Sequence, residues 1–214
     1  MGKSSGSLGW VSNFQAMKTP KLLATALAML GLCSCIPSVE PYYTADQAVV
    51  VDRLAGEWEM AHTNNEPHLW EFIKLENKTY DLTVTEDNNK KGEFTAVLFK
   101  LKENYFLDLT AKKLDFATNQ ADMVASSIIP GHLLLRVALL EPDLKLAGFD
   151  YDWLKNYLES HPRALAHHSE DGAIFLTAHT GELQGFVLKH LGKGELFGEP
   201  ETLHHTKNVA SLGP

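Results

Sequence analysis

The sequence predicts a mainly β protein, in which an antiparallel meander of roughly eight strands closes into a small barrel. Short stretches of alternating apolar and polar residues follow one another from residue 56 onward, which is the period-two pattern of half-buried strands. Polar turn residues separate these stretches. Two later segments change to helical spacing, so we also expect a helix before the last strand and a C-terminal helix packed on the sheet. Closure into a barrel is expected because it leaves no strand edge unpaired.

The first predicted strand, 56–60, reads Gly-Glu-Trp-Glu-Met and alternates small or apolar residues with acidic ones. Further strands of five to eight residues are predicted at 69–75, 80–85, 94–101, 105–110, 133–139, 144–149 and 173–177. The breaks between them are rich in Asn, Glu, Pro and Gly, as in 64–67, 86–92, 141–143 and 171–172. The stretch 112–125 has no clear period, and is either a longer excursion or a short helix around 118–124.

Three helices are predicted around this meander. The segment 47–54 allows a short helix leading into the domain, although Val49-Val50-Val51 weakens it. Asp150 caps a helix whose apolar residues recur at helical spacing until Pro162 ends it. Thr180 caps the last helix, which ends at Gly192. Its apolar stripe needs a sheet to cover it, and consists of Leu183, Phe186, Val187 and Leu191.

The N-terminal part predicts export. Residues 1–16 are rich in Ser and Gly and precede a plausible start at Met17, so they are interpreted as an over-extended gene start. Residues 17–34 have a signal-peptide layout, with two lysines followed by eleven largely apolar residues, 22–32. That run is too short to span a membrane, since a helix needs about 20 apolar residues to cross a core of about 30 Å.

The sequence Leu32-Cys33-Ser34-Cys35 directly after this run resembles the bacterial lipobox. The resemblance implies cleavage before Cys35 and attachment of a lipid to that cysteine. Residues 35–46, which contain Pro37 and Pro41, are interpreted as a tether, 47–194 as the barrel domain and 195–214 as a tail. Lipoproteins with Asp after the lipidated cysteine are often retained at the inner membrane, and Ile36 in that position therefore favours the outer membrane. The alternative is a simple secretory signal with incidental cysteines.

The charge excludes one class of partner. The net charge is −8, and loss of residues 1–34 would leave 16 basic and 27 acidic residues, a net charge of −11. Because the basic residues do not cluster, a phosphate backbone is an unfavourable partner, and nucleic acid is not expected. The expected partners are a membrane, through the lipid anchor, and a small apolar ligand or another envelope protein.

The segment Gly56-Glu57-Trp58 resembles the Gly-x-Trp signature on the first strand of lipocalins, whose tryptophan packs at the closed end of the barrel. The meander after it and the C-terminal helix extend that resemblance, whereas the family's Thr-Asp-Tyr motif and final arginine have no clear match. The resemblance implies a lipocalin-like (calycin-type) barrel that binds or carries a lipid or fatty chain. The chain is also similar to small uncharacterised bacterial lipoproteins with a Trp-Leu helix, here Trp153-Leu154, and a segment like 176–184.

Aromatic residues of the meander are the candidate ligand-pocket or core residues: Trp58, Trp70, Phe72, Tyr80, Phe94, Phe99 and Tyr105. An apolar cavity would need such a lining, but small barrels also fill their interiors with these side chains. A filled barrel would favour the alternative function, an envelope scaffold that binds another protein through its outer surface.

Catalytic, metal-binding and cofactor motifs are not found, so no enzyme activity, metal or cofactor is expected. The pairs His167-His168 and His204-His205 would point their side chains to opposite faces of a strand, and are interpreted as solvated surface. No Gly-x-Ser-x-Gly elbow follows the leader, and Ser126 and Ser127 have no identifiable base. A pair of carboxylates for glycoside hydrolysis would be sought first among Glu57, Glu59 and Glu71.

Overall fold

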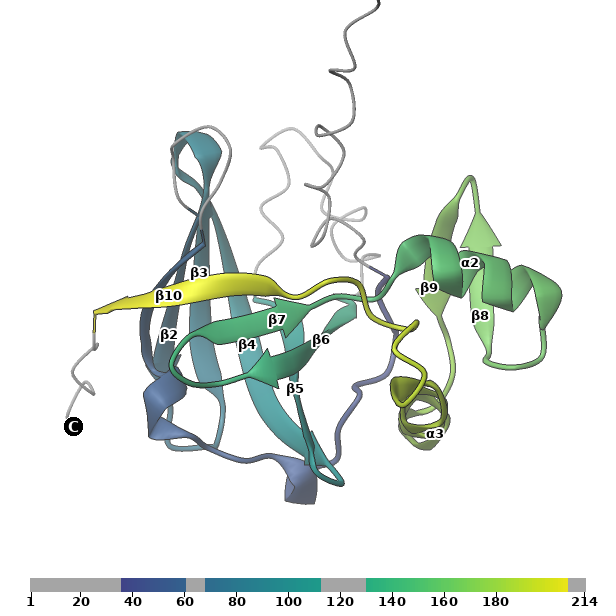
Figure 1. Cartoon of the computed structure of the whole chain (residues 1–214), viewed down its shortest axis with the longest axis horizontal. Helices are drawn as coiled ribbons and strands as arrows, with labels where there is room; N and C mark the ends of the chain where they lie inside the picture. The colour runs from purple at the N-terminus through teal and green to yellow at the C-terminus, as the bar shows by residue number, and fades with distance from the viewer. Residues whose placement is uncertain (1–35, 61–67, 113–129, 208–214) are drawn as a thin grey trace, which may run out of the picture.

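The computed structural model describes residues 36–60, 68–112 and 130–207. Within these residues the fold class is confirmed: eight antiparallel strands form a closed barrel in the order β1-β10-β7-β6-β5-β4-β3-β2 (Figure 1). The barrel strands are β1 (Gly56–Met60), β2 (His68–Lys74), β3 (Tyr80–Glu86), β4 (Lys90–Leu101), β5 (Asn104–Ala111), β6 (His132–Leu139), β7 (Leu144–Ala147) and β10 (Glu201–Lys207).

A second, smaller unit lies beside the barrel (Figure 1). It contains two helices, α2 (Tyr151–Ser160) and α3 (Thr180–Leu191), and a hairpin of two strands, β8 (His167–Glu170) and β9 (Ala173–Leu176). We call residues 148–198, which include these elements, the annex. Within the described residues, no helix is long and apolar enough to cross a membrane.

The last strand of the barrel corrects the predicted boundary of the domain. Residues 195–214 were expected to be a tail, but Glu201–Lys207 form β10, which pairs with both β1 and β7 and closes the barrel. Polar and charged residues make up this strand apart from Leu203, which is fully buried. β10 forms because the edges of β1 and β7 offer it hydrogen-bonding partners, although the sequence of β10 itself has no strand pattern. The predicted strand 173–177 instead pairs with β8, outside the barrel.

The predicted tether, 35–46, is also corrected. Ile36 and Tyr42 are buried in an apolar core, with 3% and 1% of their surface exposed. Ser38 exchanges backbone hydrogen bonds with His132 at the start of β6, and its neighbours bond to Leu176 at the end of β9. Residues 36–43, which we call the strap, therefore join barrel and annex. Cys35 and the leader lie outside the described residues.

The predicted helix at 47–54 does not form. Two short 3₁₀ turns, Ala45–Gln47 and Asp52–Leu54, flank an extended segment. Val49 there donates its N–H to the carbonyl of Leu98, and Val51 donates to the hydroxyl of Tyr80. The three consecutive β-branched residues favour this extended path, which crosses the lower end of the barrel in Figure 1. We call this the closed end.

The helices of the annex begin close to where the sequence predicts. The carboxylate of Asp150 accepts a hydrogen bond from the N–H of Trp153 and caps α2, as expected. The cap of α3 is His179 rather than Thr180, and the hydroxyl of Thr180 donates to the carbonyl of Pro41 in the strap.

Two apolar cores result. The inner core fills the barrel interior, and the outer core lies between the outer face of the barrel, the strap and the annex. The barrel contributes Phe99, Leu101, Phe106, Leu134 and Ala147 to the outer core. Helix α3 contributes Leu183, Phe186 and Val187, so the expectation that its apolar stripe packs on the sheet is confirmed.

Candidate functional site

The closed half of the barrel interior is filled by side chains. Trp58, Phe72 and Tyr80 have no exposed surface. The indole N–H of Trp58 donates to the carbonyl of Leu54, 3.0 Å away, and its ring meets the edge of His205 at 4.7 Å between centroids. Phe72 and Tyr80 meet edge to face at 6.2 Å. These aromatic residues therefore form core at the closed end and leave no room there for a ligand.

The opposite end of the interior is less completely covered. We call its inward-facing residues the open-end ring: Met60, Trp70, Val84, Phe94, Leu109, Leu133 and Leu135. Met60 and Val84 each keep 9% of their surface exposed, while Trp58, Phe72 and Tyr80 at the closed end keep none. Phe94 and Leu133 are only half-buried. Within the described residues, the buried indole N–H of Trp70 has no hydrogen-bond partner, which costs about 1–3 kcal/mol when water is excluded.

Of the predicted pocket or core residues, Phe99 lies outside the barrel interior, and Tyr105 lies at the margin of the inner core. Phe99 is fully buried, but on the outer face of β4, where it stacks on Phe106 at 5.6 Å and contacts Tyr43 of the strap. It therefore belongs to the core under the annex and cannot line the barrel interior. Tyr105 is half-buried against the inner core, with the ammonium of Lys100 5.5 Å above its ring.

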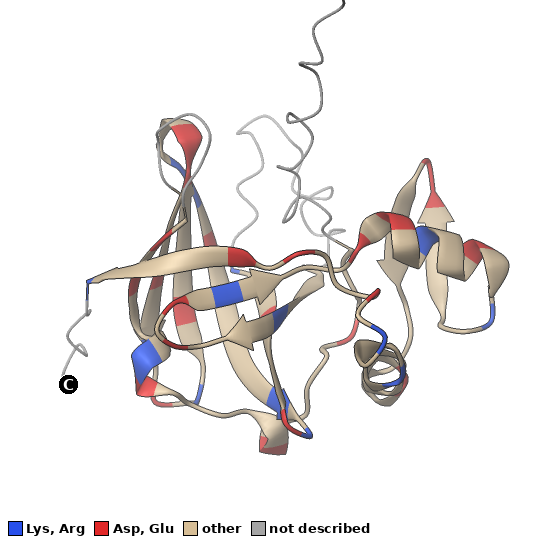
Figure 2. Cartoon of the chain, viewed as in Figure 1, with Lys and Arg blue, Asp and Glu red and all other residues tan. Residues whose placement is uncertain are grey.

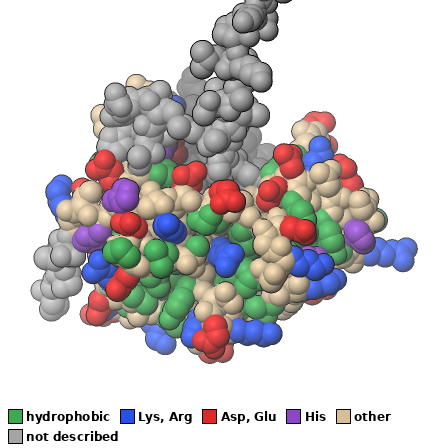
Figure 3. All heavy atoms as spheres, viewed as in Figure 1, with side chains coloured by type: hydrophobic (Ala, Val, Ile, Leu, Met, Phe, Trp, Pro, Cys, Tyr) green, Lys and Arg blue, Asp and Glu red, His purple; other side chains and the backbone are tan. Residues whose placement is uncertain are grey.

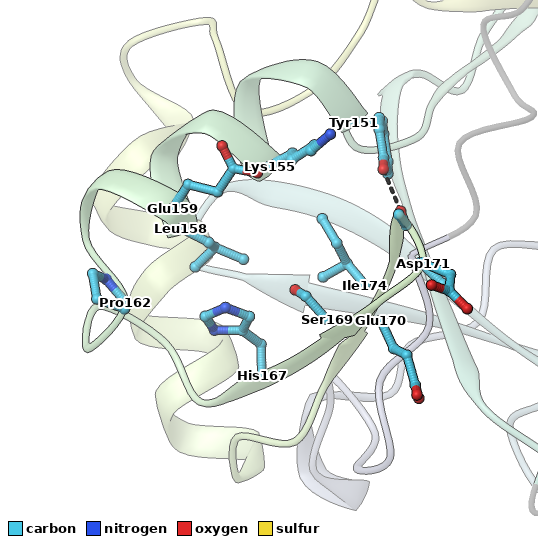
Figure 4. A pocket seen from close by; sticks show the side chains of 12 residues that line it. Tyr151, Lys155, Leu158, Glu159, Pro162, His167, Ser169, Glu170, Asp171 and Ile174 are labelled. Atoms are coloured by element: carbon cyan, nitrogen blue, oxygen red, sulfur yellow. Dashed lines mark hydrogen bonds between the residues drawn. The ribbon is translucent and has the colours of Figure 1, made fainter.

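A cleft of about 380 Å³ lies outside the barrel, between α2 and the hairpin of β8 and β9 (Figure 4). Its lining comprises Tyr151, Lys155, Leu158 and Glu159 of α2, Pro162, and His167, Ser169, Glu170, Asp171, Gly172, Ala173 and Ile174 of the hairpin. Leu158 and Ile174 are buried and form an apolar floor, while the rim carries charged and hydroxyl groups. Ligand pockets commonly have this combination, and their volumes begin at about 300 Å³.

The local sequence explains the shape of the cleft. Asp171 and Gly172 have φ values of 48° and 82°, which are those of the tight two-residue turn favoured by Asp-Gly. The hydroxyl of Tyr151 donates to the carbonyl of Gly172 and ties the tip of the hairpin to the first turn of α2 (Figure 4). Alternation along β8 then places His167 and Ser169 toward the cleft.

Two charged side chains of the cleft are available for recognition. Within the described residues, Lys155 and Glu159 form no ion pair with each other or with another side chain. The Nδ1 of His167 lies 2.8 Å from the carbonyl of Leu165, and since a carbonyl only accepts, Nδ1 is the donor. No hydrogen bond in the described part of the chain joins His167 to Ser169.

The cleft was not predicted from the sequence, because the residues that form it carry only local and weak signals. The helix and the Asp-Gly turn were both predicted, but β8 reads His-His-Ser-Glu, which has no apolar alternation. The histidine pairs were interpreted as surface. His168 is exposed beside Glu170 and His204 is exposed 2.9 Å from Asp143, whereas His205 packs against Trp58.

Other chemistry considered from the sequence is not assembled in the described residues. There, no group of three or more His, Cys, Asp or Glu side chains is placed to hold a metal ion. Glu57 and Glu71 lie opposite each other on the outer surface of β1 and β2, where Lys207 pairs with Glu57 at 3.3 Å. Acidic and basic side chains are spread over both barrel and annex (Figures 2 and 3).

Comparisons with protein-family models, with curated proteins and with solved structures find no match to this chain.

Proposed function

We propose that this chain is a non-catalytic lipoprotein of the cell envelope, held at the outer membrane by lipid on Cys35. The lipobox-like sequence at residues 32–35 supports the anchor. The test is the intact mass of the protein extracted from membranes with detergent. The proposal expects a native chain that begins at Cys35 and carries acyl groups. The Cys35→Ser variant should either keep its leader uncleaved or be released from the membrane fraction. An unmodified mass cut at another position would contradict it.

The folded domain acts by binding another envelope protein on its outer surface, and the filled closed half of the barrel is the observation that carries this proposal. Trp58, Phe72 and Tyr80 occupy the volume that a deeply bound ligand would need. Removing such side chains from a packed core costs about 3–5 kcal/mol each, so they do not move aside for a ligand.

The cleft is the proposed binding site, and a short extended peptide segment of the partner fits its chemistry best. Within residues 36–60, 68–112 and 130–207, strand β8 pairs with β9 on one side only, so its second edge offers backbone donors and acceptors. A peptide can add to such an edge as a further strand, with neighbouring pockets reading its side chains. The apolar floor of Leu158 and Ile174 suits one apolar side chain, while Lys155 and Glu159 suit charges of opposite sign.

In-cell photocrosslinking tests this site. A photoreactive amino acid replaces Ser169 in the full chain, and a second variant carries it at Glu103, an exposed residue in the turn between β4 and β5. We expect a discrete crosslinked protein from position 169 that Lys155→Glu weakens, and none from position 103. Equal crosslinking from both positions, or none from either, would count against the cleft.

A second function, binding of a small apolar molecule at the open-end ring, is favoured by one observation. The indole N–H of Trp70 has no hydrogen-bond partner among the described residues, although only 7% of the surface of Trp70 is exposed. A ligand with a carbonyl or ester oxygen and an apolar chain would satisfy that N–H and cover the ring. Ligand carried through a detergent-free purification, and lost in Trp70→Phe, would favour this function.

A further inference from the structure

The strap extends the small sheet of the annex by one strand. Val39 donates its N–H to the carbonyl of Leu176, and Leu176 donates to the carbonyl of Pro37, so Ser38 is the parallel partner of Leu176. Ser38 also pairs with His132 of the barrel through two backbone hydrogen bonds of 2.9 Å. Backbone hydrogen bonds therefore fix the strap to the barrel on one side and to β9 on the other, and Ser38, three residues after Cys35, is the point where both meet.

The two faces of this extended sheet differ. Ser38, Ile174 and Leu176 point inward and are buried. Because side chains alternate along a strand and paired residues share a face, Pro37, Val39 and Phe175 point outward together. Val39 is 50% exposed and Phe175 is 46% exposed, which makes them two of the large apolar side chains most open to solvent in the described residues. This outward face lies on the side of the hairpin away from the cleft.

A lipid on Cys35 would hold this face close to the membrane surface. The Cα atoms of Cys35 and Ile36 are about 3.8 Å apart across one peptide bond. The side chain of Ile36 is held in the outer core with 3% of its surface exposed. A lipid on Cys35 is thus joined to the folded domain by a single residue step rather than by a tether.

We propose that the outward face of the strap and β9, formed by Pro37, Val39 and Phe175, rests against the lipid bilayer that holds the anchor. The inference rests on the proposed lipidation of Cys35. Aromatic and aliphatic side chains at such a face enter the boundary between headgroups and acyl chains. The mature chain has a net charge of −11 and is repelled by anionic lipids, so contact is favoured through a face with few free acids. The acidic residue on this part of β8, Glu170, lies 3.4 Å from His168.

Contact with the bilayer fixes the orientation of the protein. β6, which receives the strap, is the fourth neighbour of β2 in both directions around the eight-stranded barrel. The turn between β2 and β3 therefore lies on the far side of the barrel from the strap, and the proposal places it away from the membrane. The cleft, on the opposite side of the hairpin from Phe175, stays accessible to a partner protein.

The experiment uses the mature lipidated chain in vesicles of phosphatidylethanolamine and phosphatidylglycerol. The whole chain contains two cysteines, Cys33 and Cys35, so the mature lipoprotein has no free thiol and an introduced cysteine is labelled uniquely. A nitrobenzoxadiazole fluorophore is placed at Val39→Cys, at Phe175→Cys and, as the control, at Glu76→Cys in the turn between β2 and β3. All three native residues are exposed, so the substitutions leave the core intact.

We expect emission from positions 39 and 175 to shift to shorter wavelength on vesicles and to be quenched by doxyl-labelled lipid, while position 76 keeps its emission in water. The intact mass of each sample reports the lipid on Cys35. A lipidated protein whose three labels all stay in water would overturn the orientation and leave the lipoprotein proposal standing. Absence of lipid from Cys35 would overturn both.

Discussion

The buried side chain of Asp108 fastens the strap to the barrel, and its removal gives the sharpest test of this packing. Asp108 has 1% of its surface exposed. One oxygen accepts from the backbone N–H of Tyr42 at 2.9 Å, and the other lies 2.7 Å from Nδ1 of His132, which must be the donor because a carboxylate only accepts. Thr110 Oγ1 lies 3.0 Å from the same nitrogen.

Replacing Asp108 by alanine leaves the Tyr42 N–H buried without an acceptor and the His132 ring without its partner. An unsatisfied buried donor costs about 1–3 kcal/mol, and water reaches the partly exposed His132 and lowers its share. We therefore expect a loss of about 3 kcal/mol in the free energy of unfolding, which corresponds to a fall of roughly 6–12 °C in Tm for a domain of this size.

Thermal unfolding followed by circular dichroism measures this loss, and Asp108→Asn separates charge from shape because it keeps the volume and one acceptor. Asp143→Asn is the matched control, since Asp143 pairs with His204 at 2.9 Å at the surface, where such pairs contribute about 0.2–1 kcal/mol. Amide exchange at Tyr42 should accelerate in Asp108→Ala. A fall in Tm no larger than that of Asp143→Asn would refute this reasoning.

Three further predictions follow from buried groups elsewhere in the fold. Burial among the rings of Trp153, Tyr157 and Phe186, together with neighbouring lysines, lowers the pKa of His190. The unfolded chain therefore binds more protons than the folded one, and the free energy of unfolding falls as the pH drops below about 6.5. Thermal unfolding at several pH values should show a smaller fall of Tm with pH in His190→Gln than in the native chain. Leu203→Ala should cost about 2–5 kcal/mol in urea unfolding, against less than about 1 kcal/mol for the exposed His204→Ala, and equal losses would contradict the place of β10 in the barrel. Gly56→Ala should destabilise the fold, because φ is 143° and the new Cβ would lie 2.7 Å from the carbonyl oxygen of Lys207. In Gly185→Ala the new Cβ in α3 meets nothing within 4 Å, and the free energy of unfolding should rise by about 0.5–1 kcal/mol. The two variants should therefore change Tm in opposite directions.

The meander was predictable because its strands carry their own period. β1 was predicted with its exact bounds, and the other strands from β2 to β7 within a few residues, since one face of each packs on the inner core. The two helices were predictable because their apolar stripes meet the outer core. Local pattern and tertiary burial agree at these positions.

The missed elements depend on partners rather than on their own residues. β10 has one buried apolar residue, Leu203, and forms because β1 and β7 each offer an unpaired edge. The strap contains Pro37 and Pro41, which suggested a tether, but its anchors are Asp108 and Leu176, both more than sixty residues away. The outward position of Phe99 follows from strand register, which aromatic composition alone does not fix.

The proposal that this barrel binds a partner outside rather than a ligand inside is tested most directly by native mass spectrometry. Residues 36–214, exported to the periplasm without the lipidated cysteine and purified without detergent, are measured before and after fatty acids and phospholipids are offered. We expect the mass of the bare chain in both cases, because Trp58, Phe72 and Tyr80 fill the closed half of the interior. A discrete lipid mass that disappears on denaturation would contradict this account and favour carriage at the open-end ring.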